Sequence, residues 1–242
     1  MIGHVARHPH HPDMSTPPTL VCHVPRYKYI TERPPENPCI KKIVEDKPGP
    51  NILGAYWSTA PDSSGLCDPT RRWVPFNGAV GSQQLEWLKT TLEESAARGE
   101  RVVLMTHALV HPSTTNGNTL MWDYDEVLEV LRSPGAAGRS VQLVLSGHQH
   151  EGGFFTDQQT GIHFVVLEAP VNSKKEKDKG PFLTVELGPT HGELRGYGNT
   201  IDNKGWQHGK LVNGSPIFPD SSLNKAGEPC IRRLKLPGMR TV

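Results

Sequence analysis

The amino-acid sequence predicts an α/β protein with a mainly β core and a helix packed on one face. Two short apolar runs, 102–106 and 141–146, have the composition of buried strands. Leu85, Leu88 and Leu92 follow each other at helical spacing, which indicates an amphipathic helix with one apolar face. Short apolar strands combined with such a helix are typical of the α/β class.

The remaining elements follow from the same patterns. In chain order we expect a strand at 52–57, a helix at 82–98, a strand at 102–106, a long loop at 107–121, a short helix near 123–131, and strands at 141–146, 162–167, 182–187 and 193–197. Ser82 is the expected N-cap of the first helix, and Gly99 is the expected end of it. A Ser-Pro-Gly sequence at 133–135 ends the second helix.

Composition limits the classes of function. The 242 residues include 24 glycines and 22 prolines, so much of the chain is expected to be loop. A net charge of +1 does not suggest a nucleic-acid or anionic-membrane partner. No run reaches the roughly 20 apolar residues of a membrane span, and the N-terminus lacks an apolar secretory core. Four cysteines without C-x-x-C spacing fit a reducing compartment, so the expected location is cytoplasmic.

The composition and the apolar pattern of the chain divide it into three parts. Residues 1–50 are rich in histidine and proline and are expected to be irregular, either disordered or not native to the domain that follows. Residues 51–200 alternate apolar runs with turn signals, which predicts the folded domain. Residues 201–242 are expected to form a C-terminal tail.

Histidines directly follow two of the predicted strands. His107 directly follows the strand 102–106, and Gly147-His148-Gln149-His150 follows the strand 141–146. A single histidine at a strand end is usually only a polar boundary residue. Three imidazoles brought to one sheet edge, however, form a ligand set for Zn, Fe, Mn or a similar ion, because the neutral ring nitrogen is a metal donor. We therefore predict that His107, His148 and His150 lie in one cluster and bind metal.

These residues carry a resemblance to a known family. The strand-His unit and the Gly-His-x-His turn resemble the two C-terminal motifs of the calcineurin-like metallophosphoesterases. The ADP-ribose/CDP-alcohol diphosphatase branch is the most similar. The matching pieces, in order, are Phe76-Asn77-Gly78-Ala79, Gln84-Leu85-Glu86-Trp87-Leu88, 103–112, Leu120-Met121-Trp122-Asp123-Tyr124 and Gly147-His148-Gln149-His150-Glu151-Gly152-Gly153. They cover about three-fifths of the chain, over 51–200.

The resemblance implies a fold, a cofactor and a reaction. The fold would be the C-terminal part of a β-sandwich flanked by helices, an incomplete αββα arrangement. His107 and His148 would bind one ion and His150 another, with Mn the expected metal and Zn or Fe the alternatives. The reaction would be hydrolysis of phosphoesters or nucleoside-diphosphate compounds by attack of a metal-bound hydroxide on phosphorus. The partner would be a small phosphate or nucleotide substrate, with no nucleic acid and no membrane.

The sequence departs from the family's pattern in its first part. The family's Asp-x-His or Asp-x-Gln, Gly-Asp and Gly-Asn-His-Asp/Glu motifs lie N-terminal to the histidine motifs, and none of them is found in that part of this sequence. The bridging carboxylate and the histidine that faces the leaving group are therefore absent, so no catalytic residue is assigned. The first sheet of the sandwich is also expected to be absent, which would leave an apolar sheet face exposed.

Other side chains have less specific interpretations. Trp122 and Tyr124 follow a long loop, so they are candidates for substrate contact. His111 is expected to be structural or exposed, and His163, inside an apolar strand, is expected to be a core residue. Trp87 is expected to anchor its helix in the core.

Three hypotheses remain open. The chain is an incomplete metal-dependent hydrolase, a non-catalytic remnant that binds metal or nucleotide, or a mis-assembled sequence whose first 50 or so residues do not belong to the domain. An upstream reading frame that encodes the absent motifs would favour the first and third hypotheses over the second.

Overall fold

A computed structural model describes most of the region that carries the predicted motifs. The described residues are 4–7 and 19–23, for which only the backbone is described, and 72, 77–115, 119–133, 140–150, 152–170, 182–197, 217 and 230–237. The strand expected at 52–57 lies outside them.

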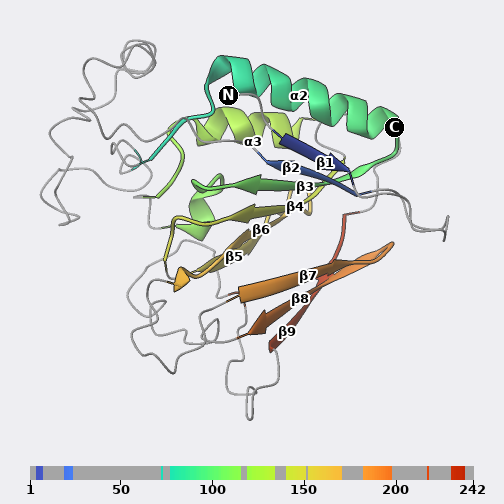
Figure 1. Ribbon diagram of the computed structural model, residues 1–242. Coiled ribbons are helices and arrows are strands. Elements are labelled where there is room, and N and C mark those ends of the chain that lie inside the picture. The colour runs from blue at the N-terminus through green and yellow to red at the C-terminus, as the bar shows by residue number, and fades with distance from the viewer. Residues whose placement is uncertain are drawn as a thin grey trace, which may run out of the picture.

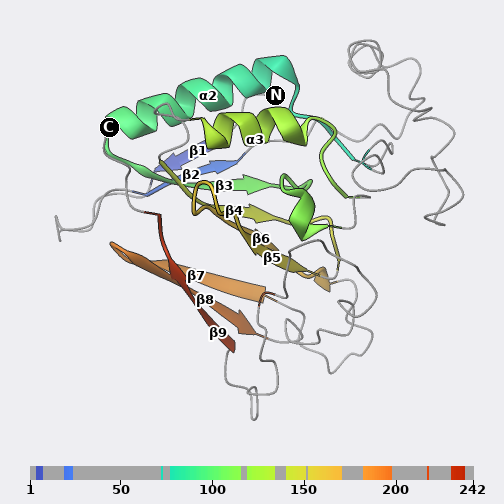
Figure 2. The same cartoon turned by 180° about the vertical axis from the view of Figure 1, so that it is seen from behind.

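The described elements form three layers (Figures 1 and 2). Two helices lie on one face of a six-stranded sheet, and a three-stranded sheet lies against its other face. The arrangement is mixed α/β, as the sequence predicted. No helix among the described residues is long and apolar enough to cross a membrane.

The larger sheet has parallel strands at its centre and an antiparallel strand at each edge. Its order is β1-β2-β3-β4-β6-β5, and β2, β3, β4 and β6 run parallel. The strand bounds are His4–Arg7 for β1, Thr19–His23 for β2, Arg101–Thr106 for β3, Val141–Ser146 for β4, Gly153–Thr156 for β5 and His163–Val166 for β6. The carboxyl ends of the parallel strands therefore meet at one edge of the sheet.

The smaller sheet is an antiparallel meander. It contains β7 (Phe182–Leu187), β8 (His191–Tyr197) and β9 (Cys230–Lys235) in that order. The sequence predicted β7 and the second half of β8. It did not predict β9, because 201–242 was expected to be a tail.

Helix α2 spans Gly81–Ala97 and helix α3 spans Tyr124–Arg132, close to the predicted ranges. Gly99 ends α2 as predicted: its φ is +67°, and the N–H groups of Gly99 and Glu100 donate to the carbonyls of Ala96 and Ser95. This pair of bonds is a Schellman motif, which glycine favours because it has no Cβ.

The predicted cap at Ser82 is wrong. No side chain of the helix's own first turn caps α2. Instead the carboxylate of Asp123 accepts hydrogen bonds from the backbone N–H groups of Val80 and Gly81, at 3.0 and 2.7 Å. An acceptor from a distant residue replaces the local cap, and it ties the start of α2 to the start of α3. Burial raises the pKa of the Asp123 carboxyl, while the two N–H donors oppose that rise.

Replacing Asp123 is therefore expected to destabilise the protein. Asp123→Ala removes the acceptor of one buried and one partly buried N–H group, which should lower the free energy of unfolding by about 2 kcal/mol. Urea denaturation followed by circular dichroism measures the change. Glu129→Ala, an exposed acid of α3, is the matched control and should change stability by less than about 0.5 kcal/mol. Equal effects of the two substitutions would contradict the capping role.

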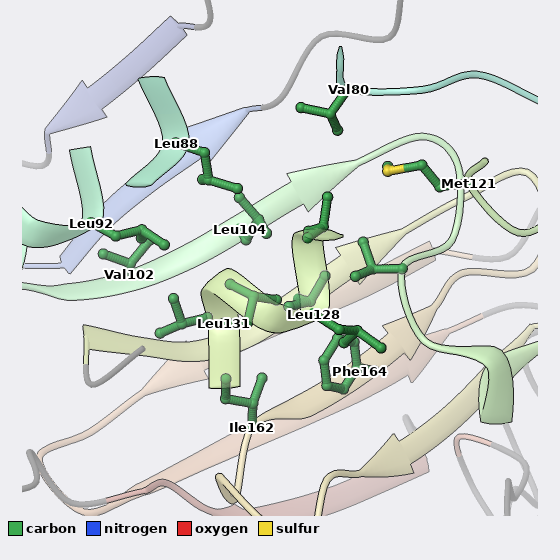
Figure 3. Packing of buried hydrophobic residues seen from close by; sticks show 14 of the residues in the cluster. Val80, Leu88, Leu92, Val102, Leu104, Met121, Leu128, Leu131, Ile162 and Phe164 are labelled. Carbon is green, nitrogen blue, oxygen red and sulfur yellow. The ribbon is translucent and has the colours of Figure 1, made fainter. Parts of the chain in front are cut away.

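The core on the helical side is built from alternate residues of the central strands. Leu88 and Leu92 of α2 contact Val102 and Leu104 of β3, and all four are fully buried (Figure 3). Leu85 and Trp87 are partly buried against the same cluster, which agrees with the predicted apolar face of the helix.

The opposite face of the large sheet is covered by the small one. Val103, Leu143 and Val165 pack in one cluster with Leu194 and Leu234 of the small sheet. The expectation that this face is exposed is therefore wrong in the described part of the chain. The covering sheet comes from 182–197 and 230–235, not from the N-terminal region.

The N-terminal region was also expected to be irregular, yet two of its segments are strands. β1 and β2 extend the large sheet beyond β3, with Leu20 opposite Val102 and Val21 opposite Val103. Both strands are only four or five residues long, and isolated apolar runs of that length do not distinguish a strand from a loop.

Candidate metal centre

The structure brings two of the three predicted ligands together. His107 follows β3 and His148 follows β4, and these neighbouring parallel strands are in register at Thr106 and Ser146. The two imidazole rings are 4.8 Å apart between centroids and are tilted by 48°. The register of the strands therefore places both rings at the same edge of the sheet.

Hydrogen bonds hold the two strand ends at a fixed distance. The hydroxyl of Thr106 donates to the carbonyl of Ala108, so the 2.8 Å contact between the Thr106 and Ser146 hydroxyls has Ser146 as donor. The N–H of Gly147 donates to the carbonyl of His107 at 3.2 Å. These bonds attach the first residue after β4 to the first residue after β3.

His148 has an unusual backbone conformation. Its φ is +68°, the one positive φ among the described non-glycine residues, and the N–H of Gln149 donates to the carbonyl of Gly147 at 2.8 Å. A hydrogen bond that spans three residues around a positive φ is the rarer, strained form of the γ-turn. Strain of this kind is often found at functional sites.

The side chain of His148 is oriented by Asn77. The Nε2 atom of His148 lies 2.9 Å from Oδ1 of Asn77, whose amide nitrogen donates to the carbonyl of Arg72, also at 2.9 Å. Asn77 is buried, and it precedes α2 by four residues. It belongs to the Phe-Asn-Gly-Ala sequence that matched the family, but sequence reasoning gave it no role.

Gln149, between the two histidines, points inward. Its side chain is buried, and its Oε1 accepts from the hydroxyl of Thr119 at 2.8 Å. Thr119 in turn lies 2.6 Å from the hydroxyl of Thr115. The loop that follows β3 therefore anchors the turn that follows β4.

His150 is exposed at the same turn. Its carbonyl accepts from the N–H of Ala169, which follows β6. Gly152, with φ +72°, packs against Glu168: a Cβ at this position would lie 2.8 Å from the Cγ of Glu168 and 3.3 Å from the carbonyl oxygen of Val166. The turn is thus held between β4 and β6.

Gly152→Ala is expected to be more destabilising than Gly99→Ala. Both glycines have a positive φ, which costs about 1–2 kcal/mol for an L-residue. A Cβ on Gly99 meets nothing within 4 Å, whereas one on Gly152 collides with Glu168. The clash should add a further 1–3 kcal/mol or so. Urea denaturation of the two variants isolates this difference, and equal destabilisation would show that Glu168 moves aside without cost.

The two candidate substrate residues differ in exposure. Trp122 is only 1% exposed. Its backbone N–H donates to the carbonyl of Gly78, and its backbone carbonyl accepts from Nε of Arg72. Its indole is therefore a core side chain in this structure. Tyr124 is half-buried and lies beneath the guanidinium of Arg72, 5.0 Å from ring centroid to Cζ. Substrate contact remains a prediction for both residues.

Two further histidines are buried away from the pair. Nδ1 of His111 accepts from the N–H of Ser113, and its ring stacks on Phe155. His163 on β6 contacts the hydroxyl of Thr156 and the carbonyl of Lys235. Burial lowers the pKa of both imidazoles, to about 4 for His111. The expectation that His163 is a core residue is confirmed.

The histidine pair fits part of a metal shell. Imidazole nitrogens lie about 2.0–2.1 Å from an ion, so two rings on one ion must have centroids within about 6.5 Å of each other. The 4.8 Å between His107 and His148 satisfies this condition. The described residues contain no group of three or more histidines, cysteines, aspartates or glutamates placed to hold an ion. A three-histidine site that includes His150 therefore stays a prediction.

The chain is similar to a group of metal-dependent diphosphatases. It is 36% identical over 128 residues to a manganese-dependent ADP-ribose/CDP-alcohol diphosphatase of Arabidopsis thaliana, covering 53% of this chain and 37% of that protein. The protein of the same name from Mus musculus is 30% identical over 164 residues, covering 68% of this chain and 43% of the relative. The chain thus spans less than half the length of these relatives. No protein-family model matches it.

A solved structure is similar to this chain as well. The crystal structure of a dimetal phosphatase from Danio rerio superimposes with a TM-score of 0.59 and 26% identity, over 76% of this chain and 56% of that one. Sequence and fold together show that this part of the chain is related to the calcineurin-like metallophosphoesterases. Within that class its similarity is to the manganese-dependent ADP-ribose/CDP-alcohol diphosphatases.

Proposed function

We propose that this chain carries the C-terminal half of the active site of a metal-dependent hydrolase that acts on ADP-ribose, CDP-alcohols or related nucleoside diphosphates. The observation that carries the proposal is the pair of imidazoles, His107 and His148, at the edge where two parallel strands end. Ligand sites of open α/β sheets lie at this edge.

The chain's own residues would bind and orient the ion. His107 and His148 supply two nitrogen donors, and His150 is the third predicted donor. A divalent ion in such a site polarises a phosphoryl oxygen and activates water for attack. Mn is the expected ion because the relatives are named as manganese-dependent, and Zn and Fe are the alternatives.

Manganese binding tests this proposal directly. Titration of the 242-residue chain with Mn²⁺, with free Mn²⁺ counted by electron paramagnetic resonance, should show saturable binding. His107→Ala and His148→Ala should each lower the affinity by at least about tenfold, because each removes a donor. Since His107 is exposed, the melting temperature of His107→Ala without metal should change little. His148→Ala should lower it, because this change also removes the hydrogen bond to the buried amide oxygen of Asn77.

The control for this experiment is His191→Ala. His191 is an exposed histidine on β8, in the other sheet, and should not affect Mn²⁺ binding. Unchanged affinity in both His107→Ala and His148→Ala would refute the proposed metal site.

A second function is favoured by the limited number of donors. Among the described residues, no third histidine, cysteine, aspartate or glutamate is grouped with His107 and His148. A chain with that donor set fits a binding protein for a metal ion or a nucleotide without catalysis. Saturable Mn²⁺ or ADP-ribose binding without turnover would favour this function over the hydrolase.

A further inference from the structure

The amide of Asn77 has a single consistent orientation. One end of it lies 2.9 Å from the carbonyl of Arg72, which can only accept a hydrogen bond. The NH₂ group must therefore face Arg72. The amide oxygen then faces Nε2 of His148, at 2.9 Å.

This orientation determines which nitrogen of His148 carries the proton. An amide oxygen accepts but cannot donate, so Nε2 of His148 must be the donor and must bear the hydrogen. A neutral imidazole has one N–H and one lone pair, which places the lone pair on Nδ1. Asn77 is 1% exposed, so water does not compete for its amide oxygen.

The segment that carries Asn77 is held rigidly. The carbonyl of Gly78 accepts from the N–H of Trp122 at 2.9 Å, and the N–H groups of Val80 and Gly81 donate to Asp123. Trp122 and Asp123 therefore hold residues 78–81, which lead from Asn77 into α2, in place. Because this segment is fixed, the amide of Asn77 can set the orientation of the His148 ring.

We infer that Asn77 is a positioning residue that holds His148 in the Nε2–H tautomer and so presents Nδ1 of His148 to the metal ion. The inference rests on the proposed function, since it assumes that His148 is a ligand. Ligand histidines commonly donate their second N–H to an oxygen acceptor, and loss of such an acceptor typically costs 10- to 100-fold or so in metal affinity.

Two variants of Asn77 separate the acceptor from the packing. Asn77→Asp keeps an oxygen that accepts from His148, but it replaces the donor to Arg72 by a second acceptor oxygen and adds a negative charge at a buried position. Asn77→Leu keeps the branching at Cγ, with larger methyl groups and no acceptor. Gln142→Leu is the matched control, because Gln142 is a fully buried amide at the opposite end of β4 and donates to the carbonyl of Ser140.

The tautomer is measured in the metal-free full chain by long-range ¹H–¹⁵N correlation of labelled histidines at alkaline pH, where the rings are neutral. The His148 signals are assigned by their absence from His148→Gln. We expect the Nε2–H tautomer in the wild type, Asn77→Asp and Gln142→Leu. Asn77→Leu should show a substantial Nδ1–H population and bind Zn²⁺ about 10- to 100-fold more weakly than the wild type.

The outcomes distinguish the inference from the function on which it rests. An Nδ1–H ring in the wild type overturns the inference, whether or not Asn77→Leu folds, and leaves the proposed metal site standing. An Asn77→Leu protein with the wild-type tautomer and Zn²⁺ affinity also overturns it. If Zn²⁺ leaves the wild-type ring signals of His148 unchanged, the proposed function fails, and the ligand role of His148 fails with it.

Discussion

The 242-residue chain is expected to show little or no Mn²⁺-stimulated hydrolysis of ADP-ribose, CDP-choline or bis-p-nitrophenyl phosphate. Its described residues bring together two imidazoles and no carboxylate that could bridge two ions. Removing one group that stabilises a transition state typically costs about 10²–10³ in rate. None of the three family motifs precedes the histidine motifs in this sequence, so several such groups are absent at once.

Adding a segment that contains the Asp-x-His/Gln, Gly-Asp and Gly-Asn-His motifs should bring hydrolysis back, measured as phosphate or nucleotide release by chromatography. In that extended protein His150→Ala and His148→Ala should each lower kcat/KM by about 10²-fold or more. His191→Ala, in the three-stranded sheet, should leave kcat/KM unchanged. Robust turnover by the 242-residue chain that survives His107→Ala and His148→Ala would refute both the proposed reaction and the assigned site.

The central elements could be predicted because their sequence signals are local. The strands β3 and β4 are buried on both faces, so they appear as continuous apolar runs. The helix α2 shows its apolar face through the spacing of its leucines, and its end through Gly99. Because both strands are parallel neighbours, the residues that follow them meet at one edge, which is why His107 and His148 could be paired from the sequence.

Most of the elements that were missed depend on distant partners; β5, which pairs with the nearby β6, was also not predicted. β9 has alternating exposure and several charged residues, so it became a strand only by pairing with β8. The same holds for β1 and β2, which pair along the edge of β3. The N-cap of α2 was assigned to Ser82 because capping was expected from a nearby residue, whereas Asp123 supplies it from 42 positions away.

The role of Asn77 could not be deduced from the sequence for a related reason. Its contact with His148 spans 71 positions, and an asparagine before a glycine usually indicates a turn. The signal available was its membership in the Phe-Asn-Gly-Ala piece, which matched the family without an obvious packing function. A polar residue in such a match, next to a predicted helix start, is a reasonable place to look for a contact with a ligand.

Acid is expected to destabilise the protein through His111, which lies in the loop after β3. Burial lowers the pKa of His111 from 6.5 to about 4, and the nearby guanidinium of Arg132 lowers it further than the carboxylate of Asp157 raises it. The N–H of Ser113 points at Nδ1, and an N–H of Arg132 lies 3.1 Å from Nε2. A neutral imidazole has one lone pair, and here Nδ1 uses it to accept from Ser113. Protonation would place a hydrogen on Nδ1 against the N–H of Ser113 and a positive charge beside the guanidinium of Arg132.

The direction of the pH effect follows from the two pKa values. The unfolded chain binds this proton near pH 6.5 and the folded chain only near pH 4, so stability is full above 6.5 and is lost as the pH falls toward 4. A shift of that size corresponds to a loss on the order of 3 kcal/mol over this range. The pKa of His163 is lowered in the same direction, so it adds to the loss.

His111→Phe separates this contribution from the others, because the phenyl ring keeps the stacking on Phe155 and cannot be protonated. Its stability at neutral pH should be lower, since the N–H of Ser113 loses its acceptor, but its further loss on acidification should be smaller than that of the wild type by most of about 3 kcal/mol. Urea denaturation at a series of pH values between 7 and 4 measures both slopes. His191→Gln, which changes an exposed histidine, should keep the wild-type slope. If His111→Phe loses stability with acid as steeply as the wild type, the buried neutral ring is not the cause of the acid sensitivity.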